Sequence, residues 1–181
     1  RVTNKYDFTG NLIAQRESHE SGDTTNNLYR YFVFDSRGRL TKETAQFNDG
    51  EQAVVAYTYD ELGQLSGKTY GTGAHAIHET MDYNMQGWLT EKSSELFEMK
   101  LRYYDPEPYY GGDAYYTGNI SEWWWQHKNV NGNYDADNNT YIFHYDDLSR
   151  LNDSRLTYNE SEDITDEFVE NGITYDKNSN I

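Results

Sequence analysis

The chain has 181 residues, carries 15 basic and 31 acidic side chains for a net charge of −16, and contains no cysteine. This excess of carboxylates argues against nucleic acid or an anionic membrane surface as a partner, because both are recognised through basic patches. Disulfides and thiolate metal sites are excluded, and no apolar stretch approaches the roughly 20 residues of a membrane-spanning helix, so no membrane insertion is expected within this sequence.

Aromatic residues supply most of the large apolar surface. The chain has 18 Tyr, 7 Phe and 4 Trp. Disordered chains are depleted in aromatic residues, whereas here they recur at ordered spacings. We therefore expect a folded protein that uses aromatic rings where others use aliphatic side chains, in a thin sheet rather than a thick core.

One motif recurs along the chain: an aromatic residue, then Asp or Asn, two variable residues, Gly or Ser, another variable residue, and Leu or Ile. The copies span residues 6–12, 32–40, 57–65, 83–89, 145–151 and 175–181, with a degenerate copy at 115–120. The glycine-equivalent positions are 10, 38, 63, 87, 118, 149 and 179. This regular spacing predicts an array of similar structural units along 1–181.

Each copy has the chemistry of a tight β-turn. Asp at the first turn position and Gly at the fourth are typical of a type I turn closed by a glycine bulge, with alternating strand residues on both sides. The predicted turn residues are Asp7, Gly10, Asp35, Gly38, Asp60, Gly63, Asn84, Gly87, Gly118, Asp146 and Asp176. Ser149 and Ser179 replace the glycine, which predicts weaker turns or turns of another type.

The turn type also predicts strand register. A bulged Gly63 would place Asp60 opposite Gln64 and Tyr59 opposite Leu65. The same arithmetic pairs Phe34 with Leu40, Tyr6 with Leu12 and Tyr83 with Leu89. The expected fold is all-β: antiparallel β-hairpin repeats forming a twisted, spiralling sheet.

Two segments depart from the strand pattern. The only two prolines, Pro106 and Pro108, lie together in the Tyr- and Gly-rich stretch 103–116, which predicts an irregular loop. The acidic run 161–171 has a capping Ser161 and a terminating Gly172, so one or two helical turns are an alternative there.

These motifs resemble the YD repeat of Rhs proteins, teneurins and the shell-forming components of insecticidal toxin complexes. The stretch 116–121 (YTGNIS), followed by Trp125, is similar to a segment of bacterial surface Rhs-like proteins. The resemblance implies hairpins that wind into a spiral and close into a hollow shell in longer members. It also implies an extracellular or cell-surface bacterial location. The chain begins with Arg1 and ends within a motif, so we expect a fragment of a larger protein.

The chain departs from the family pattern in the serine-containing turns and in its longer repeats. It also lacks the terminal core, bearing arginine and aspartate, at which some members cut themselves. Tyr103 to Pro106 only superficially resembles that core, so autoproteolysis is not expected.

Metal sites are weakly indicated. His75 and His78 lie three residues apart, which in a strand places them on opposite faces, so a shared ion is not expected there or at Glu79. The segment 131–139 is rich in oxygen ligands but fits no EF-hand register, and an exposed connection is the simpler interpretation. No metal and no cofactor is predicted.

Three consecutive tryptophans are the least usual local feature. In a strand, Trp123 and Trp125 share one face and Trp124 occupies the other. Packing on neighbouring hairpins is the simplest account. A ligand-binding role, with flat rings stacked on sugars, is the alternative.

No nucleophile elbow, phosphate loop or dinucleotide fingerprint occurs, so no catalytic residue is proposed. The leading hypothesis is a non-catalytic structural module that scaffolds, encloses or displays another part of its polypeptide. Its partners would be adjacent repeats or an effector domain. The alternative is a carbohydrate- or cell-wall-binding module with glycans as partners, and a glycan-active enzyme is a distant third.

Overall fold

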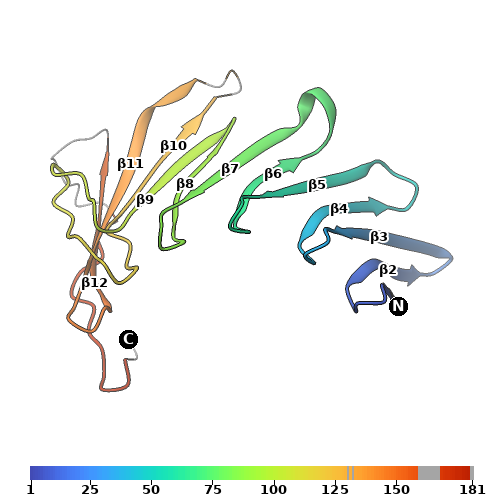
Figure 1. Ribbon diagram of the computed structural model, residues 1–181, viewed down its shortest axis with the longest axis horizontal. Coiled ribbons are helices and arrows are strands. Elements are labelled where there is room, and N and C mark those ends of the chain that lie inside the picture. Colours follow the sequence, from blue (N-terminus) through green and yellow to red (C-terminus); the bar gives the residue numbers. More distant parts are fainter. Residues whose placement is uncertain (130, 132, 159–167, 180–181) are drawn as a thin grey trace. The chain divides into compact units, whose positions relative to one another are not determined.

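The computed structural model describes residues 1–129, 131, 133–158 and 168–179. Its regular structure consists of β-strands and one short 3-10 helix. The chain divides into two compact units, residues 1–80 and 81–181, which are considered separately (Figure 1). Within the described residues, no helix is long and apolar enough to cross a membrane.

The first unit is an antiparallel sheet whose strands are adjacent in chain order. Its strands are β1 (Val2–Tyr6), β2 (Leu12–Ser21), β3 (Thr24–Phe34), β4 (Leu40–Phe47), β5 (Gln52–Tyr59) and β6 (Leu65–Tyr70). The short helix η1 (Gly73–His75) then leads into β7 (Ile77–Tyr83), whose first half pairs with β6.

The second unit contains the end of β7 and five further strands. These are β8 (Leu89–Ser94), β9 (Phe97–Arg102), β10 (Glu122–Lys128), β11 (Tyr134–Tyr145) and β12 (Leu151–Tyr158). Neighbours from β8 to β12 are antiparallel. Beyond β12, Glu170 forms a two-way backbone bridge with Ser154.

The predicted fold class, an all-β array of antiparallel hairpins, is confirmed. The predicted register is confirmed at three hairpins, where Tyr6 pairs with Leu12, Phe34 with Leu40 and Tyr59 with Leu65. Each pair follows a one-residue register shift, as expected for a bulged turn. The winding of such hairpins into a spiral stays a prediction.

Little of the sheet is deeply buried. Among the described strands, those that contact one another are neighbours in the sequence. In residues 1–80, all described, no large apolar side chain is fully buried. The buried apolar residues are Met81, Tyr103, Tyr110, Ile142 and Leu156, all in the second unit. The thin, aromatic-rich sheet expected from the composition is therefore what forms.

The connection between β9 and β10 explains why the second unit has a core. Residues 103–121 contain bends and turns but no strand, so the predicted irregular loop around Pro106 is confirmed. The loop packs on the sheet at Glu122, whose carboxylate accepts the Glu107 backbone N–H at 3.1 Å. The copy at 115–120 lies within this loop. Gly118 has a φ of +98°, but it does not close a hairpin, which corrects that part of the repeat reading.

Most of the possible helix at 161–171 lies outside the described residues, and Glu170 is part of the bridge to Ser154. The segment 131–139 is not simply an exposed connection, because β11 begins at Tyr134 and includes its second half.

Candidate functional site

The repeated turn is organised by the carboxylate or amide at its first position. Asp35 Oδ1 accepts the backbone N–H groups of Arg37 at 2.8 Å and Arg39 at 2.9 Å. The Asp35 N–H donates to the Arg39 carbonyl at 2.9 Å, and the Gly38 N–H donates back to Asp35 at 3.0 Å. These bonds hold a five-residue loop whose strands leave in a fixed register.

The same pattern of acceptance from the residues two and four positions ahead recurs in other turns. Its centres are Asp7, Asn84 and Asp146. Asp60 accepts the Gln64 N–H at 2.8 Å, and Asp176 accepts the Asn178 N–H at 2.8 Å. An amide oxygen serves as well as a carboxylate here, because only acceptance is needed.

The serine-containing turns are not of another type. Ser149 has a φ of +61° and Ser179 a φ of +62°, in the left-handed region that Gly63 occupies at +89°. The Ser149 N–H donates to Asp146 at 2.9 Å, as the glycine does elsewhere. Serine therefore adopts the glycine geometry with a conformational cost, because its Cβ disfavours positive φ.

One turn of this kind was missed in the sequence. Asn129 Oδ1 accepts the N–H groups of Asn131 at 2.9 Å and Asn133 at 3.2 Å, and the Asn129 N–H donates to Asn133. The available signal was an Asn with Gly132 three positions later. Tyr134 stands at the position where the motif has Leu or Ile, so the segment does not match the full motif.

At several places in the described residues, a tyrosine hydroxyl donates to the carbonyl of the residue that ends an earlier copy of the motif. Tyr59 donates to the carbonyl of Leu40, the last residue of the preceding motif, at 2.8 Å. The equivalent pairs are Tyr103 with Leu89 at 2.8 Å, Tyr145 with Ile120 at 3.0 Å and Tyr175 with Leu151 at 2.7 Å. Burial raises the pKa of Tyr103 and of Tyr145, which keeps these hydroxyls protonated as donors.

A second contact reinforces each of these joints. Arg39 bonds Asp35 in its own turn, with Nε at 2.8 Å, and its guanidinium lies 4.5 Å from the ring centroid of Tyr59 in the next turn. Arg150 makes the same two contacts: its Nε donates to Asp146 at 2.8 Å, and its guanidinium lies 4.6 Å from the ring centroid of Tyr175. Elsewhere an aromatic ring replaces the guanidinium: Trp88 packs on Tyr103 and Tyr115 on Tyr145, both with centroids 5.0 Å apart. We call the hydroxyl bond plus the stacked group the inter-turn clip.

The three tryptophans lie in β10 and alternate between faces as predicted. Trp123 and Trp125 contact each other, with centroids 4.7 Å apart, and both stack on Tyr141 of β11. On the opposite face, Trp124 lies under Lys100, whose Nζ is 5.1 Å from the ring centroid. All three indoles are half-buried against neighbouring strands. Their ligand-binding role stays a prediction.

Glu122 is a deeply buried acidic group of the second unit. Its side chain is 1% exposed, and burial raises the pKa of its carboxyl to about 7. The Glu107 backbone N–H and the positive charge of Arg102, whose Nε lies 3.7 Å away, oppose that rise. Sequence reasoning did not single out Glu122, because its burial depends on the loop 103–121 folding over it.

No metal centre is formed by the described residues: no three His, Cys, Asp or Glu side chains converge. His75 ends η1, whereas His78 lies in β7 with Nδ1 at 3.1 Å from the Thr69 hydroxyl.

Comparison with known proteins reveals a structural likeness. No protein-family model and no curated protein matches the chain. The chain is similar to one in the crystal structure of the TcdB2–TccC3–Cdc42 complex, with a TM-score of 0.59 and 14% identity over 84% of this chain. The Tc holotoxin pore of Photorhabdus luminescens, with a mutant TccC3, matches 87% of this chain with a TM-score of 0.47 and 12% identity.

The first of these likenesses confirms the resemblance to the repeat-containing components of toxin complexes at the level of the fold. At 14% identity it extends no further than the fold. This chain covers 7% of the matched chain in the first structure and 9% in the second, so it corresponds to a small part of either.

Proposed function

We propose that this chain is a non-catalytic structural module of a larger bacterial surface or secreted protein of the Rhs type. Its hairpins would form part of a wall that scaffolds, encloses or displays another part of the polypeptide. The observation that carries the proposal is the inter-turn clip. It joins neighbouring repeats through residues 14 to 25 positions apart, and such contacts stabilise an extended array rather than a compact pocket.

The similarity in fold to a chain of the TcdB2–TccC3–Cdc42 complex supports this proposal. The partners would then be adjacent repeats or an effector domain of the same polypeptide, in an extracellular or cell-surface location. The chemistry of the best-defined residues also favours it. The side chains of Asp35, Asp146 and Arg150 are engaged within turns and clips, whereas catalysis requires polar groups that converge on a substrate.

The experiment lengthens the array by one repeat. Duplicating residues 36–60 directly after Asp60 adds one β-hairpin period while keeping every turn in register. We expect a higher urea midpoint for the first unit, followed by circular dichroism, because each added interface contributes stability. The control inserts a glycine- and serine-rich segment of equal length at the turn 48–50. A duplication that lowers the midpoint as much as the control would refute the array interpretation.

The non-catalytic part has its own test. The chain should show no turnover of peptide or glycan substrates. Hydrolysis that a single Asp or Glu substitution abolishes would overturn this part of the proposal.

A further inference from the structure

The first two turns lack the inter-turn clip. In the first motif, Asn11 occupies the position that Arg39 has in the second. The side-chain amide of Asn11 donates a hydrogen bond to Asp7 Oδ2 at 3.0 Å. The position of Tyr59 is occupied in the second motif by Phe34, which has no hydroxyl to donate to the Leu12 carbonyl. Among the described residues, no guanidinium or aromatic ring is stacked on Phe34. Both halves of the clip are missing here.

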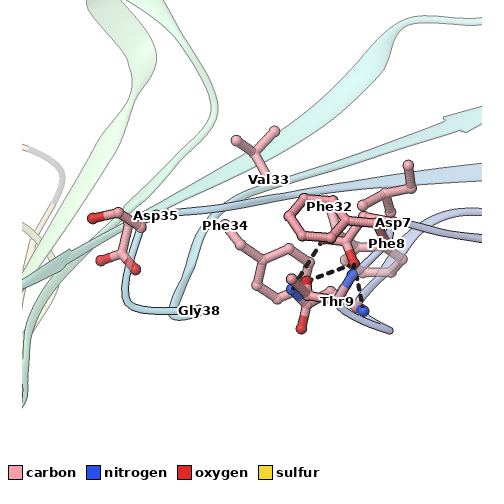
Figure 2. Close-up of a pocket in the computed structure, with 11 residues that line it drawn as sticks. Asp7, Phe8, Thr9, Phe32, Val33, Phe34, Asp35 and Gly38 are labelled. Atoms are coloured by element: carbon pink, nitrogen blue, oxygen red, sulfur yellow. Dashed lines mark hydrogen bonds between the residues drawn. The ribbon is translucent and has the colours of Figure 1, made fainter.

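A pocket of about 710 Å³ lies at this place. Its apolar lining includes Phe8, Phe32 and Phe34, and its polar lining includes Asp7 and Asn11 of the first turn and Asp35 of the second. Figure 2 shows the rings of Phe8, Phe32 and Phe34 beside the first turn. Phe8 is fully exposed at 101%, so one wall of the pocket is an aromatic ring without cover.

The two turns differ in what their carboxylates hold. Asp35 Oδ2 accepts Arg39 Nε at 2.8 Å and lies 2.7 Å from a terminal guanidinium nitrogen of the same residue. Asp7 Oδ2 accepts only the Asn11 amide among the described residues. The ionised state of Asp7 is secured independently, because hydrogen bonds from Thr9 and Asn11 lower its pKa. Asp7 is thus a carboxylate with acceptor capacity next to a pocket lined by aromatic rings.

We propose that this pocket binds an arginine side chain from a partner peptide. The guanidinium would pair with Asp7 Oδ2 and lie over Phe34, as Arg39 pairs with Asp35 and lies over Tyr59 in the next joint. Arginine suits the site better than lysine, because a planar guanidinium can donate to a carboxylate and stack on a ring simultaneously. The net charge of −16 favours the approach of a cationic segment.

The arginines nearest in sequence have other partners or do not line the pocket. Arg1 lies instead beside a different depression, with Glu17 and Ser18. Arg16 is bonded to Asn27 at 2.9 Å, and Arg30 pairs with Glu17 at 3.3 Å. Arg37, although it belongs to the second turn, is not part of the pocket lining. The occupant is therefore assigned to a partner peptide.

The test titrates the isotope-labelled chain with N-acetyl-arginine amide and follows backbone amide shifts by NMR. We expect saturable shifts at Asp7, Thr9, Asn11 and Phe34. N-acetyl-citrulline amide, which has the same shape without the charge, should bind at least about tenfold more weakly. Equal responses to arginine and citrulline, or shifts spread over the acidic surface without saturation, would overturn the proposal.

Two variants sharpen the result. Asn11→Arg supplies a guanidinium within the chain, as in the second motif, and should weaken probe binding at least about tenfold. Thr25→Arg is the matched control, because it adds the same charge at an exposed residue outside the pocket lining, and it should bind within about twofold of the unmodified chain. Undiminished binding to a folded Asn11→Arg would place the probe elsewhere. The comparison of arginine with citrulline needs no variant and decides the question even if Asn11→Arg fails to fold.

Discussion

Ser149 pays a conformational cost that glycine would avoid, and this makes Ser149→Gly a stabilising substitution. Its φ of +61° is in the left-handed region, where a side chain costs about 1–2 kcal/mol. Replacing serine by glycine also lowers the free energy of unfolding by about 0.5–1 kcal/mol, because the unfolded chain gains conformational freedom. The net expectation is a gain of roughly 0.5–1 kcal/mol in the free energy of unfolding.

Tryptophan fluorescence is the appropriate assay, because Trp88, Trp123, Trp124 and Trp125 all belong to the second unit, as Ser149 does. For a urea dependence of about 1–2 kcal/mol/M, the midpoint should rise by roughly 0.3–1 M.

The matched control lies in the same turn. Asp147→Gly changes a residue without positive φ, so only the entropic loss remains and the midpoint should fall. The reasoning is refuted if Ser149→Gly lowers the midpoint, or if the two substitutions shift it equally in the same direction.

Three further predictions concern the second unit. Tyr145→Phe removes the hydroxyl bonded to the Ile120 carbonyl at 3.0 Å and should cost about 1 kcal/mol in urea unfolding, whereas Tyr116→Phe, at a ring that is 76% exposed, should be nearly neutral. Gly118→Ala should destabilise the unit by about 1 kcal/mol or more, because φ is +98° and the added Cβ would lie 3.2 Å from the Trp88 ring; an unchanged midpoint would contradict this. The pKa of Glu122 is raised from 4.5 to about 7, so the folded state holds this proton more tightly, and stability should fall as pH rises between these values and level off above. Glu122→Gln should remove a fall on the order of 3 kcal/mol, and identical pH profiles for the two proteins would contradict the assignment.

The sequence by itself determined the hairpins and their register. A turn such as 35–39 is held by bonds between residues at most four positions apart, so the Asp and Gly spacing is sufficient to define it. The strand pairs that follow, such as Phe34 with Leu40, are then a consequence of the turn geometry. The degenerate copy at 115–120 was misread for the same reason: without the Asp, its glycine does not specify a hairpin.

Only the tertiary structure decided what the turns do to one another. The clip between Arg39 and Tyr59 joins residues from different hairpins, and no local pattern states that their side chains meet. The burial of Glu122 likewise depends on the loop 103–121 lying against β10, which is a matter of packing rather than of propensity. The pocket beside Phe34 depends on the missing clip. In the sequence, Asn11 at the position of Arg39 does not indicate a binding site. The site that we propose depends on two turns that line one open pocket, which only the folded structure shows.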